Sequence, residues 1–478
     1  MREEILRMEN VSKTVKGIIY LDNINFHIFK GEIMGLLPLN NHGKDKLIQL
    51  ISQNTSIDFG RIYFNENLVN YYEYSSMTYN KVYTIDKETQ LVEDLNVIDN
   101  IYVLNNNFDG YIIRQKKIKN KVDKLIEELE LNIETNQLVS QLSIFKKSAI
   151  QLIKAVATGA KLIILDEISN FLGLEELLKF QNLVRYYTEK GISFLYMANH
   201  HEEAFQICHR ASLFENGKIV KIIEKEDFSD KIMKPYIIKF DTGMGISSNH
   251  TEKSFRFKNF VTKNLKRSSF SVGKGECITI LDVDNKGIQD IEQILEGKIS
   301  PSTGQIVVND NKMNKVNPYN LLVNKVAFIP ENPIEEALFY DMSYMGNLTF
   351  LMDYKLKSSI VKDKILKGIE REYKPLVGSD IKEKDIKNLG SRSLYYLVYY
   401  RVLLFNPNVV FIVQPFSNAD MYLRNEIIKL INNFKENDIG VVILAVSISD
   451  TLYVSDKLLV MKKGIISQEI ESKYFFKT

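Results

Sequence analysis

The amino-acid sequence predicts an α/β protein that carries two copies of one domain in tandem. The segment KGE at 30–32 recurs at 274–276, and FGRIYFN at 59–65 recurs as TGQIVVN at 303–309, with the same spacing in both pairs. Within each copy, short β-rich runs alternate with helix-like segments, which is the pattern of an α/β sheet. We therefore expect two domains of the same α/β fold.

Composition supports this organisation and excludes several classes of protein. A chain of 478 residues with 45% hydrophobic residues exceeds what one core usually supports, so two domains or more are expected. The 62 basic and 60 acidic residues nearly cancel, which argues against a protein built mainly to hold nucleic acid. Cys208 and Cys277 are too few for a disulfide framework or a cysteine-rich metal site, and they fit a reducing cytoplasm.

The chain order suggests where the domains begin and end. We expect the first domain at 1–225, a polar, turn-rich linker at 226–250 and the second domain at 251–478. The N-terminal stretch MREEILRMENVSK is charged, and the sequence contains no run of about 18 apolar residues. We therefore expect neither a signal peptide nor a membrane-spanning segment.

Within the first domain, short patterns predict individual elements. IYFNENL at 62–68, KVYTI at 81–85 and KLIIL at 161–165 are typical of strands, because they are short and rich in β-branched and aromatic residues. KVDKLIEELEL at 121–131 has the spacing of an amphipathic helix.

The stretch GLLPLNNHGKDK at 35–46 has the layout of a phosphate-binding loop. It follows an apolar run, precedes a helix-like segment and ends in Gly43 and Lys44. In such a loop the backbone N–H groups approach the phosphates at the positive end of a helix, and the lysine reaches the outer phosphates. The alternative is that Gly43 and Lys44 only form a turn into a helix.

The loop also departs from the usual pattern. Pro38 and Asn41 occupy positions where glycine is expected, and Asp45 and Lys46 replace the hydroxyl pair that would bind Mg²⁺. Asp45 would repel a phosphate by about 4 kcal/mol per charge pair at roughly 4 Å and an effective dielectric near 20. A bound Mg²⁺ or Lys46 would offset this repulsion.

A second candidate site follows the apolar strand KLIILDE at 161–167. Two adjacent carboxylates at the end of a buried strand can divide the work, with Asp166 holding Mg²⁺ and Glu167 polarising an attacking water. The alternative is a buried strand followed by a solvated acidic turn. The second copy has NVVFIVQ at 408–414, in which both carboxylates are missing.

Taken together, these motifs resemble an ATP-binding cassette. The phosphate loop is followed by QLSIFKKSAIQLIKAVATGAKLIILDEIS at 141–169 and by FLYMANHHEEAFQICHRASLFENGKIV at 194–220. The chain is most similar in kind to the tandem-cassette ATPase subunits of bacterial sugar importers of the ribose, galactose and xylose type. KVAFIPENPIEEALFYDMSYMGNL at 325–348 carries that likeness into the second half. The resemblance implies two tandem cassettes of the P-loop NTPase class, with degenerate nucleotide-site motifs.

The resemblance also implies roles for single residues. Lys44 matches the phosphate-binding lysine, Asp166 the metal-holding carboxylate and Glu167 the catalytic base. Ser143 falls where the family's signature motif begins, a segment that caps the nucleotide held by the opposite cassette. The glycines that should follow are replaced by the bulky Ile144 and Phe145.

Other family positions are altered as well. Lys87 stands at the position of the glutamine that couples metal to the membrane partner, Asn199 at the switch histidine and Val15 at the adenine-stacking aromatic. Tyr20 is a candidate replacement stacker. His200 and His201 adjoin the switch position, and we expect them to be a solvated surface pair.

The second cassette has lost more of the pattern. Asp282 and Asn285 stand at glycine positions, Ile288 at the lysine position, and Val413 and Gln414 at the carboxylate positions. We therefore expect no hydrolysis in this half.

The resemblance implies an ATP-binding subunit of a carbohydrate importer, using ATP and Mg²⁺ and coupling nucleotide binding, with at most weak hydrolysis, to membrane permease subunits. The permease would link it to a solute-binding protein. The chain itself would lie at the cytoplasmic face of the membrane and would not bind nucleic acid, and it could form a homodimer. We expect permease contacts at 97–102 and 342–348, although core packing would use the same apolar spacing. The alternative is an inactive pseudo-ATPase that acts as a binding or regulatory module.

Overall fold

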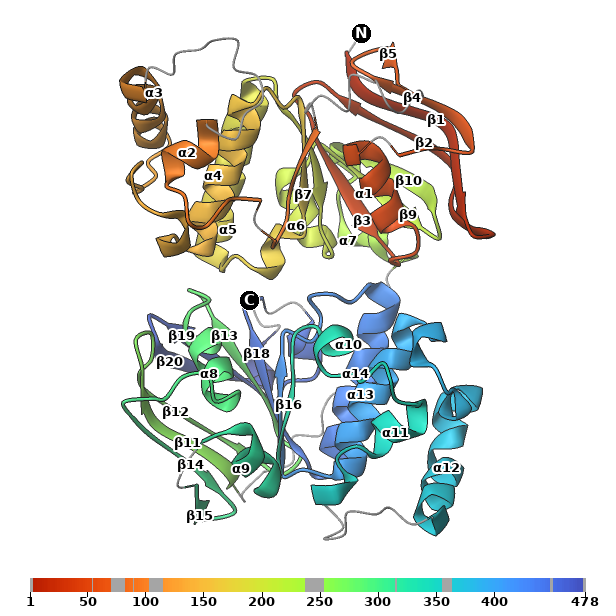
Figure 1. Ribbon diagram of the computed structural model, residues 1–478, viewed down its shortest axis with the longest axis vertical. Coiled ribbons are helices and arrows are strands. Elements are labelled where there is room, and N and C mark those ends of the chain that lie inside the picture. Colours follow the sequence, from red (N-terminus) through yellow and green to blue (C-terminus); the bar gives the residue numbers. More distant parts are fainter. Residues whose placement is uncertain are drawn as a thin grey trace. The chain divides into compact units, whose positions relative to one another are not determined.

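The computed structural model divides the chain into two compact units, residues 1–238 and 239–478 (Figure 1). The structure describes residues 3–53, 55–69, 82–88, 90–102, 115–236, 253–313, 316–354, 363–447 and 450–475. Each unit contains one antiparallel sheet, one mostly parallel sheet and a set of helices. The chain is therefore an α/β protein with two domains, as its sequence predicts.

The strands of the first unit alternate with its helices. The strands are β1 (Glu4–Val15), β2 (Ile18–Phe29), β3 (Ile33–Pro38), β4 (Phe59–Phe64), β5 (Asn67–Leu68), β6 (Val82–Ile85), β7 (Leu162–Asp166), β8 (Ser193–Met197), β9 (Arg210–Glu215) and β10 (Lys218–Glu224). The helices are α1 (Lys44–Gln53), α2 (Val97–Tyr102), α3 (Gln115–Glu128), α4 (Ile144–Ala157), α5 (Leu174–Glu189), α6 (His201–Ile207) and α7 (Asp230–Met233). The elements expected around 62–68, 81–85, 121–131 and 161–165 are β4 with β5, β6, α3 and β7.

Two sheets organise the first unit. The antiparallel sheet has the order β2-β1-β4-β5, and the larger sheet has the order β10-β9-β3-β8-β7-β6. In the larger sheet β9, β3, β8, β7 and β6 are parallel, and only β10 runs antiparallel to its neighbour. The central strands are almost fully buried, as expected for a parallel sheet that is covered on both faces.

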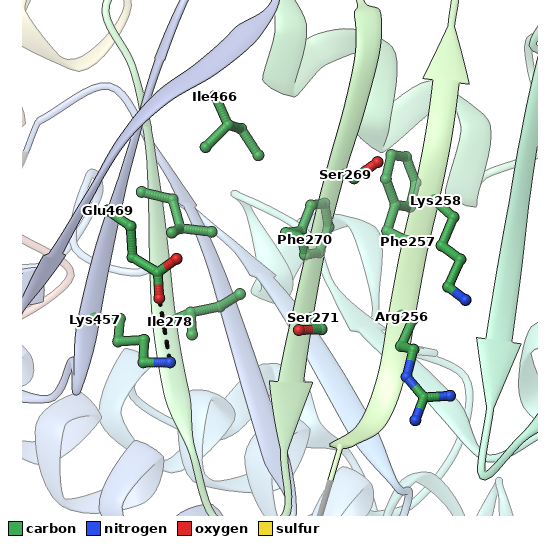
Figure 2. A pocket seen from close by; sticks show the side chains of 11 residues that line it. Arg256, Phe257, Lys258, Ser269, Phe270, Ser271, Ile278, Lys457, Ile466 and Glu469 are labelled. Atoms are coloured by element: carbon green, nitrogen blue, oxygen red, sulfur yellow. Dashed lines mark ion pairs between the residues drawn. The ribbon is translucent and has the colours of Figure 1, made fainter.

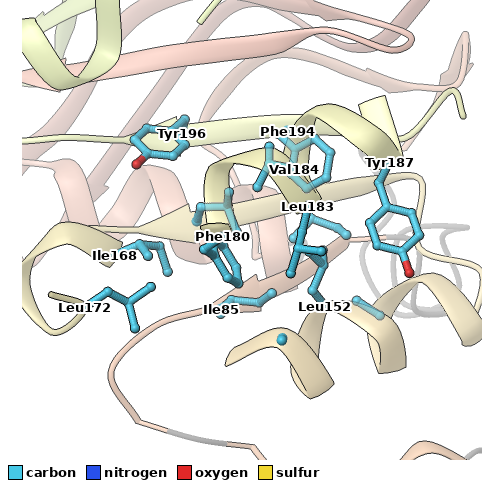
Figure 3. Close-up of a cluster of buried hydrophobic side chains, with 14 of the residues drawn as sticks. Ile85, Leu152, Ile168, Leu172, Phe180, Leu183, Val184, Tyr187, Phe194 and Tyr196 are labelled. Atoms are coloured by element: carbon cyan, nitrogen blue, oxygen red, sulfur yellow. The ribbon is translucent and has the colours of Figure 1, made fainter. Parts of the chain in front are cut away.

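Alternate residues of β7 enter different cores. Ile163 and Leu165 pack with α4 and α5, in the cluster drawn in Figure 3 around Phe180, Val184, Phe194 and Tyr196. Leu162 and Ile164 pack on the other face, with α1 and the antiparallel sheet. This period of two fixes the strand's register, because a slip of one residue would exchange the two faces.

The second unit repeats the same elements. Its strands are β11 (Lys253–Val261), β12 (Lys266–Gly273), β13 (Cys277–Asp282), β14 (Thr303–Val308), β15 (Asn311–Lys312), β16 (Val326–Ile329), β17 (Val409–Val413), β18 (Gly440–Ala445), β19 (Lys457–Lys462) and β20 (Ile465–Glu471). Its helices are α8 (Gly287–Leu295), α9 (Pro318–Val323), α10 (Pro333–Glu336), α11 (Tyr344–Thr349), α12 (Asp363–Val377), α13 (Ser391–Phe405) and α14 (Met421–Glu436). The sheet orders β12-β11-β14-β15 and β20-β19-β13-β18-β17-β16 match those of the first unit strand for strand.

A buried asparagine occupies the same place in both units. Asn100 is fully buried, accepts the N–H of Val92 at 2.7 Å and donates to the Val92 carbonyl at 2.9 Å. Asn347 makes the same pair of bonds with Phe339, at 2.9 and 2.8 Å. Each asparagine thus satisfies the backbone of the segment before a short helix, α2 or α11, from inside the core.

The predicted linker at 226–250 divides into two parts. Helix α7 lies within it, and Met233 is buried in the core of the first unit, with Phe228, Ile232 and Tyr236 packed against it. Residues 226–236 therefore pack on the first unit. The rest of the linker lies outside the described residues, so its connecting role remains a proposal. Among the described residues, no helix is long and apolar enough to span a bilayer.

The glutamate of the KGE segment at 30–32, Glu32, forms a buried ion pair in the first unit. Glu32 accepts from Arg210 Nε at 2.6 Å and from Nη2 at 3.1 Å, and both side chains are only 5% exposed. Glu32 Oε2 also accepts the N–H of Phe29 at 2.7 Å, so the carboxylate ties the end of β2 to β9. This pair joins the antiparallel sheet to the parallel sheet.

Arg210→Gln should therefore lower the free energy of unfolding of the first unit by about 3 kcal/mol, since it leaves the Glu32 charge buried without its partner. The measurement is urea unfolding of the full chain, followed by probes in the first unit. Lys218→Gln is the control, because the Lys218–Asp22 pair at 2.8 Å is 55% and 43% exposed, and it should change stability by less than about 0.5 kcal/mol. Equal losses in the two variants would contradict this assignment.

Candidate functional site

The predicted loop and the predicted carboxylate pair meet at one edge of the parallel sheet. The loop at 39–43 follows β3, and α1 begins at Lys44, while Asp166 ends β7 and Glu167 follows it. Strand β8 pairs with β3 on one side and with β7 on the other, and all three are parallel. Their carboxyl ends therefore lie at the same edge, which is where open α/β sheets bind ligands.

Lys44 contacts both carboxylates across this edge. Its Nζ lies 2.6 Å from Glu167 Oε1 and 3.9 Å from Asp166 Oδ1. The side chains are 11%, 14% and 25% exposed for Lys44, Glu167 and Asp166. The site is thus largely withdrawn from water, where each electrostatic interaction is stronger than on the surface.

The backbone holds Glu167 in an uncommon conformation. Its φ is 50°, in the left-handed region, and its N–H donates to the Met197 carbonyl at 3.2 Å. Asn170 Nδ2 donates to Glu167 Oε2 at 2.8 Å. The second unit repeats this turn at Gln414, with φ 40° and an N–H bond to Leu444 at 2.8 Å. The turn therefore belongs to the fold, and only the first unit places a carboxylate on it.

Burial shifts the ionisation of these groups. Burial by itself lowers the pKa of Lys44, but the Glu167 and Asp166 carboxylates outweigh it, so the pKa is raised. Burial raises the pKa of Asp166 to about 6, with Glu167, Asp86 and Asp45 adding to the rise and Lys44 opposing it. Asp166 therefore sits where added positive charge would be favourable.

The loop before Lys44 is closely packed. Gly43 has φ 85°, and a Cβ there would lie 2.1 Å from the Tyr20 carbonyl oxygen, so only glycine fits. The Tyr20 ring stacks on His42 with centroids 5.3 Å apart and ring planes 9° apart. One face of the Tyr20 ring is thus in contact with His42.

The other predicted nucleotide-binding residues take different positions. Asp45 lies in the first turn of α1, where a negative charge is favourable at the positive end of the helix. Lys46 donates to Gln49 at 2.9 Å, one turn along the helix. Ser143 is the N-cap of α4 and accepts from the Lys146 N–H at 3.4 Å. The structure therefore brings Lys44 to Asp166 and Glu167 and gives Ser143 a capping contact elsewhere.

Sequence reasoning missed two residues of this site. Asp86 follows β6 at the same sheet edge, and burial raises its pKa. Asn170 orients Glu167. Asp86 directly precedes Lys87, which stands at the family position of the metal-coupling glutamine, so its place in the sequence could have identified it. A lone asparagine three residues after Glu167 gives no such signal.

The carboxylates suit a divalent cation that shares its shell with phosphates. Asp166 Oδ1 and Asp86 Oδ1 are buried and have no hydrogen-bond partner among the described residues. In the described part of the chain, no group of three or more His, Cys, Asp or Glu side chains forms a ready-made metal site. Mg²⁺ commonly takes only one or two carboxylates together with substrate phosphates, so the residues fit that mode.

The expectation of a solvated histidine pair is wrong for His201. Its side chain is only 11% exposed, its ring meets Phe205 edge to face at 5.3 Å, and its Nδ1 lies 3.3 Å from Glu202. His201 lies on the face of α6 that also carries Ala204 and Ile207, and this face packs against the core.

The matching positions of the second unit are apolar or neutral. Ile288 is 3% exposed and Val413 is 3% exposed, so both are core residues. A separate pocket of this unit, of about 370 Å³, lies over β11, β12, β13, β19 and β20 (Figure 2). Two of the cations that line it are paired, Lys457 with Glu469 at 3.2 Å and Arg256 with Asp310 at 2.6 Å, and we assign the pocket no ligand.

The raised pKa of Asp166 predicts a pH dependence of stability. An unfolded aspartate titrates near about 3.9, so the protonated folded state is favoured between that value and about 6. This contribution is fully present below about pH 4 and is lost as the pH rises through about 6. Relative to Asp166→Asn, the natural chain should therefore lose about 3 kcal/mol of unfolding free energy over this range, measured by urea unfolding. The exposed Asp94→Asn is the control, and a flat difference between natural chain and Asp166→Asn would contradict the prediction.

Known proteins share this organisation. Residues 21–170 match the family model described as ABC transporter. The chain is 26% identical over 479 residues to the ribose import ATP-binding protein RbsA of Clostridium tetani, covering 97% of this chain and 94% of that protein. It is 24% identical over 476 residues to the galactose/methyl galactoside import ATP-binding protein MglA of Clostridium perfringens, covering 97% and 92%.

A solved structure can be compared with one part of the chain. It is cbiO1 of Clostridium perfringens, part of the ABC transporter complex cbiONQ, at 18% identity and a TM-score of 0.44 over 49% of this chain and 94% of that chain. The two sheets of each unit and the loop before α1 agree with these similarities. Residues 21–170 match the ABC transporter family, the chain is similar over nearly its whole length to import ATP-binding proteins, and its fold is that of two ATP-binding cassettes in tandem.

Proposed function

We propose that this chain is the ATP-binding subunit of a carbohydrate importer, docked on a membrane permease at its cytoplasmic face. The observation that carries the proposal is the approach of Lys44 to the Asp166–Glu167 pair at the mouth of the first phosphate loop. The sugar class comes from the names of the relatives, which import ribose and galactose or methyl galactoside.

The first cassette keeps a lysine and two carboxylates of the kind that a nucleotide and its cation need. Lys44 would turn from Glu167 to the outer phosphates, and Asp166 would hold the cation through its buried Oδ1. Bound Mg²⁺ would supply positive charge between the phosphates. Both Glu167 oxygens are engaged here, by Lys44 at 2.6 Å and by Asn170 at 2.8 Å. Removal of the lysine by phosphate would free one oxygen to accept a proton from water.

Several features limit turnover in this proposal. Asn199 stands at the switch position, and Asp45 adds a negative charge to the first turn of α1, close to where phosphates would bind. Loss of one positioned acid or base typically costs about 10²- to 10⁴-fold in rate. Binding with at most weak hydrolysis is therefore the function we propose for the first cassette.

The second candidate function is an inactive relative that keeps the fold as a binding or regulatory module. Asp45 favours this candidate, because its carboxylate at the N-terminus of α1 stabilises the positive end of the helix dipole without a bound phosphate. The importer subunit is expected to bind ATP and release some phosphate, whereas the inactive module is expected to fold with negligible turnover.

The deciding experiment measures ATP binding with Mg²⁺ by calorimetry and phosphate release on the same samples. Lys44→Ala should weaken binding about 10- to 100-fold, because it removes a charge-assisted contact to phosphate. Glu167→Gln should keep binding and lower phosphate release about 10²- to 10⁴-fold. Lys190→Ala is the control, since Lys190 is 51% exposed and lies before β8, at the amino ends of the parallel strands, and it should change neither quantity.

Each outcome separates the candidates. Absence of ATP binding by the natural chain would favour the inactive module and contradict the importer ATPase. Binding that Lys44→Ala leaves unchanged would place the nucleotide elsewhere.

The buried apolar residues of the two segments predicted to contact the permease, 97–102 and 342–348, cannot make that contact. Val97 and Ile101 are buried in the first unit, as are Tyr344 and Leu348 in the second. Their apolar spacing therefore reflects core packing. The exposed apolar residues lie just before these helices: Val92 and Phe339 hold equivalent places beside the buried asparagines, and each is 42% exposed.

In the second unit Phe339 opens onto an apolar groove of about 560 Å³. Phe350, also 42% exposed, meets Phe339 with ring centroids 4.3 Å apart. The groove continues along Leu322, Leu351, Val398 and Val402. An apolar groove that remains exposed suits a helical segment of a protein partner, here proposed to belong to the permease.

Phe339→Asp and Val92→Asp should each reduce co-sedimentation of the full chain with membranes that contain its permease, by about tenfold, because a carboxylate would have to be desolvated in the contact. Phe59→Asp is the control: Phe59 is 69% exposed on β4, in the antiparallel sheet of the first unit. Unchanged co-sedimentation of both variants would remove this surface from the proposal.

A further inference from the structure

The phosphate loop of the second unit carries an aspartate at the position of Pro38, where phosphate-binding loops usually have glycine. Strand β13 ends at Asp282, and α8 begins at Gly287, so Asp282 stands directly before the loop. The residue is fully buried. A buried carboxylate needs partners, and the neighbouring backbone supplies them.

Four backbone N–H groups converge on the Asp282 carboxylate. Oδ2 accepts from Lys286 at 2.8 Å, from Gly287 at 2.6 Å and from Ile288 at 3.1 Å. Oδ1 accepts from Asp284 at 3.1 Å. Burial raises the pKa of Asp282, and these four N–H groups act in the opposite direction, so the charged form depends on them.

This arrangement has the chemistry of an occupied phosphate loop. Successive N–H groups at the start of a helix form the cradle in which such loops hold phosphate oxygens. Here two carboxylate oxygens fill that cradle. The surroundings are equally tight, because a Cβ on Gly287 would lie 2.3 Å from Met461 Sδ and 3.3 Å from Asp282 Oδ2.

The first loop lacks this internal anion. Pro38 occupies the position of Asp282, and a proline side chain cannot accept a hydrogen bond. A neutral side-chain acceptor within that loop is Asn40 Oδ1, which accepts the N–H of His42 at 3.2 Å and of Asn216 at 3.1 Å. The two copies therefore use the same fold with a different occupant of the loop.

We infer that the Asp282 carboxylate is a built-in ligand of the second phosphate loop, which occupies the place of a nucleotide phosphate and closes the second cassette to nucleotide. The inference deepens the proposed function, on which it rests for the assignment of nucleotide binding to the first cassette. The Asp282 carboxylate thereby holds the phosphate loop of the second cassette in one conformation at every nucleotide concentration.

The test uses inorganic pyrophosphate, which probes the loop without contacts to a base or ribose. All proteins are full chains with Lys44→Ala, so that the first loop contributes little. Lys44→Ala alone should show no pyrophosphate binding by calorimetry, and Lys44→Ala with Asp282→Gly should gain binding, since the cradle is then open. Lys44→Ala with Asp284→Gly is the matched control and should not bind, because Asp284 Oδ2 accepts the Lys463 N–H outside the cradle.

Two results would overturn the inference. One is pyrophosphate binding to residues 282–288 of the chain that retains Asp282. The other is a folded Asp282→Gly chain that binds no pyrophosphate.

A second measurement needs no variant and so does not depend on folding of Asp282→Gly. Amide hydrogen exchange over 282–290 of the natural chain should be the same with and without millimolar pyrophosphate, because the N–H groups are already bonded. Added protection there would contradict the inference. This result is independent of ATP binding at Lys44, so failure of the proposed function and failure of this inference can be told apart.

Discussion

The parallel pairing of β3, β8 and β7 is the constraint on which the first cassette depends. Apolar side chains on both faces of these strands are removed from water, so the pairing cannot slip without exposing one core and burying polar groups in the other. Parallel direction then places the ends of β3 and β7 at one edge. Lys44 and Glu167, far apart in the sequence, come within 2.6 Å as a consequence.

The contact between Lys44 and the two carboxylates is a balance of opposed terms. Burial disfavours each charge. The two carboxylates outweigh this effect for Lys44, whereas Lys44 only partly opposes it for Asp166. In the proposed function, Lys44 would exchange Glu167 for phosphate, and Asp166 would gain a cation.

The two cassettes show that fold and site chemistry are separable. Both keep the sheet order, the buried asparagine before a short helix and the left-handed turn that follows β7 or β17, at Glu167 and Gln414. These features rest on backbone hydrogen bonds and apolar packing, which tolerate Ile288 in place of a lysine and Val413 in place of a carboxylate. In the second loop, Asp282 supplies from within the chain the anion that the backbone cradle requires.

The sequence by itself determined the α/β class, the tandem repeat and the grouping of Lys44, Asp166 and Glu167 as candidates. These follow from periodicity, from repeated segments and from motifs whose residues are close neighbours in the chain. The tertiary structure decided which of the other residues join them. Asp86 and Asn170 reach the site through strand order and a tight turn, and Tyr20 meets His42 through packing.

The sequence did not predict the role of Asp282, because in the sequence this residue only marks a position where glycine is expected. Whether a carboxylate points into a backbone cradle depends on the dihedral angles of the loop and on the packing of Met461 against Gly287. Local patterns encode which residues are apolar and where the chain turns. Hydrogen bonds that close around a buried charge are decided only when the whole domain has folded, because their geometry depends on every element that surrounds them.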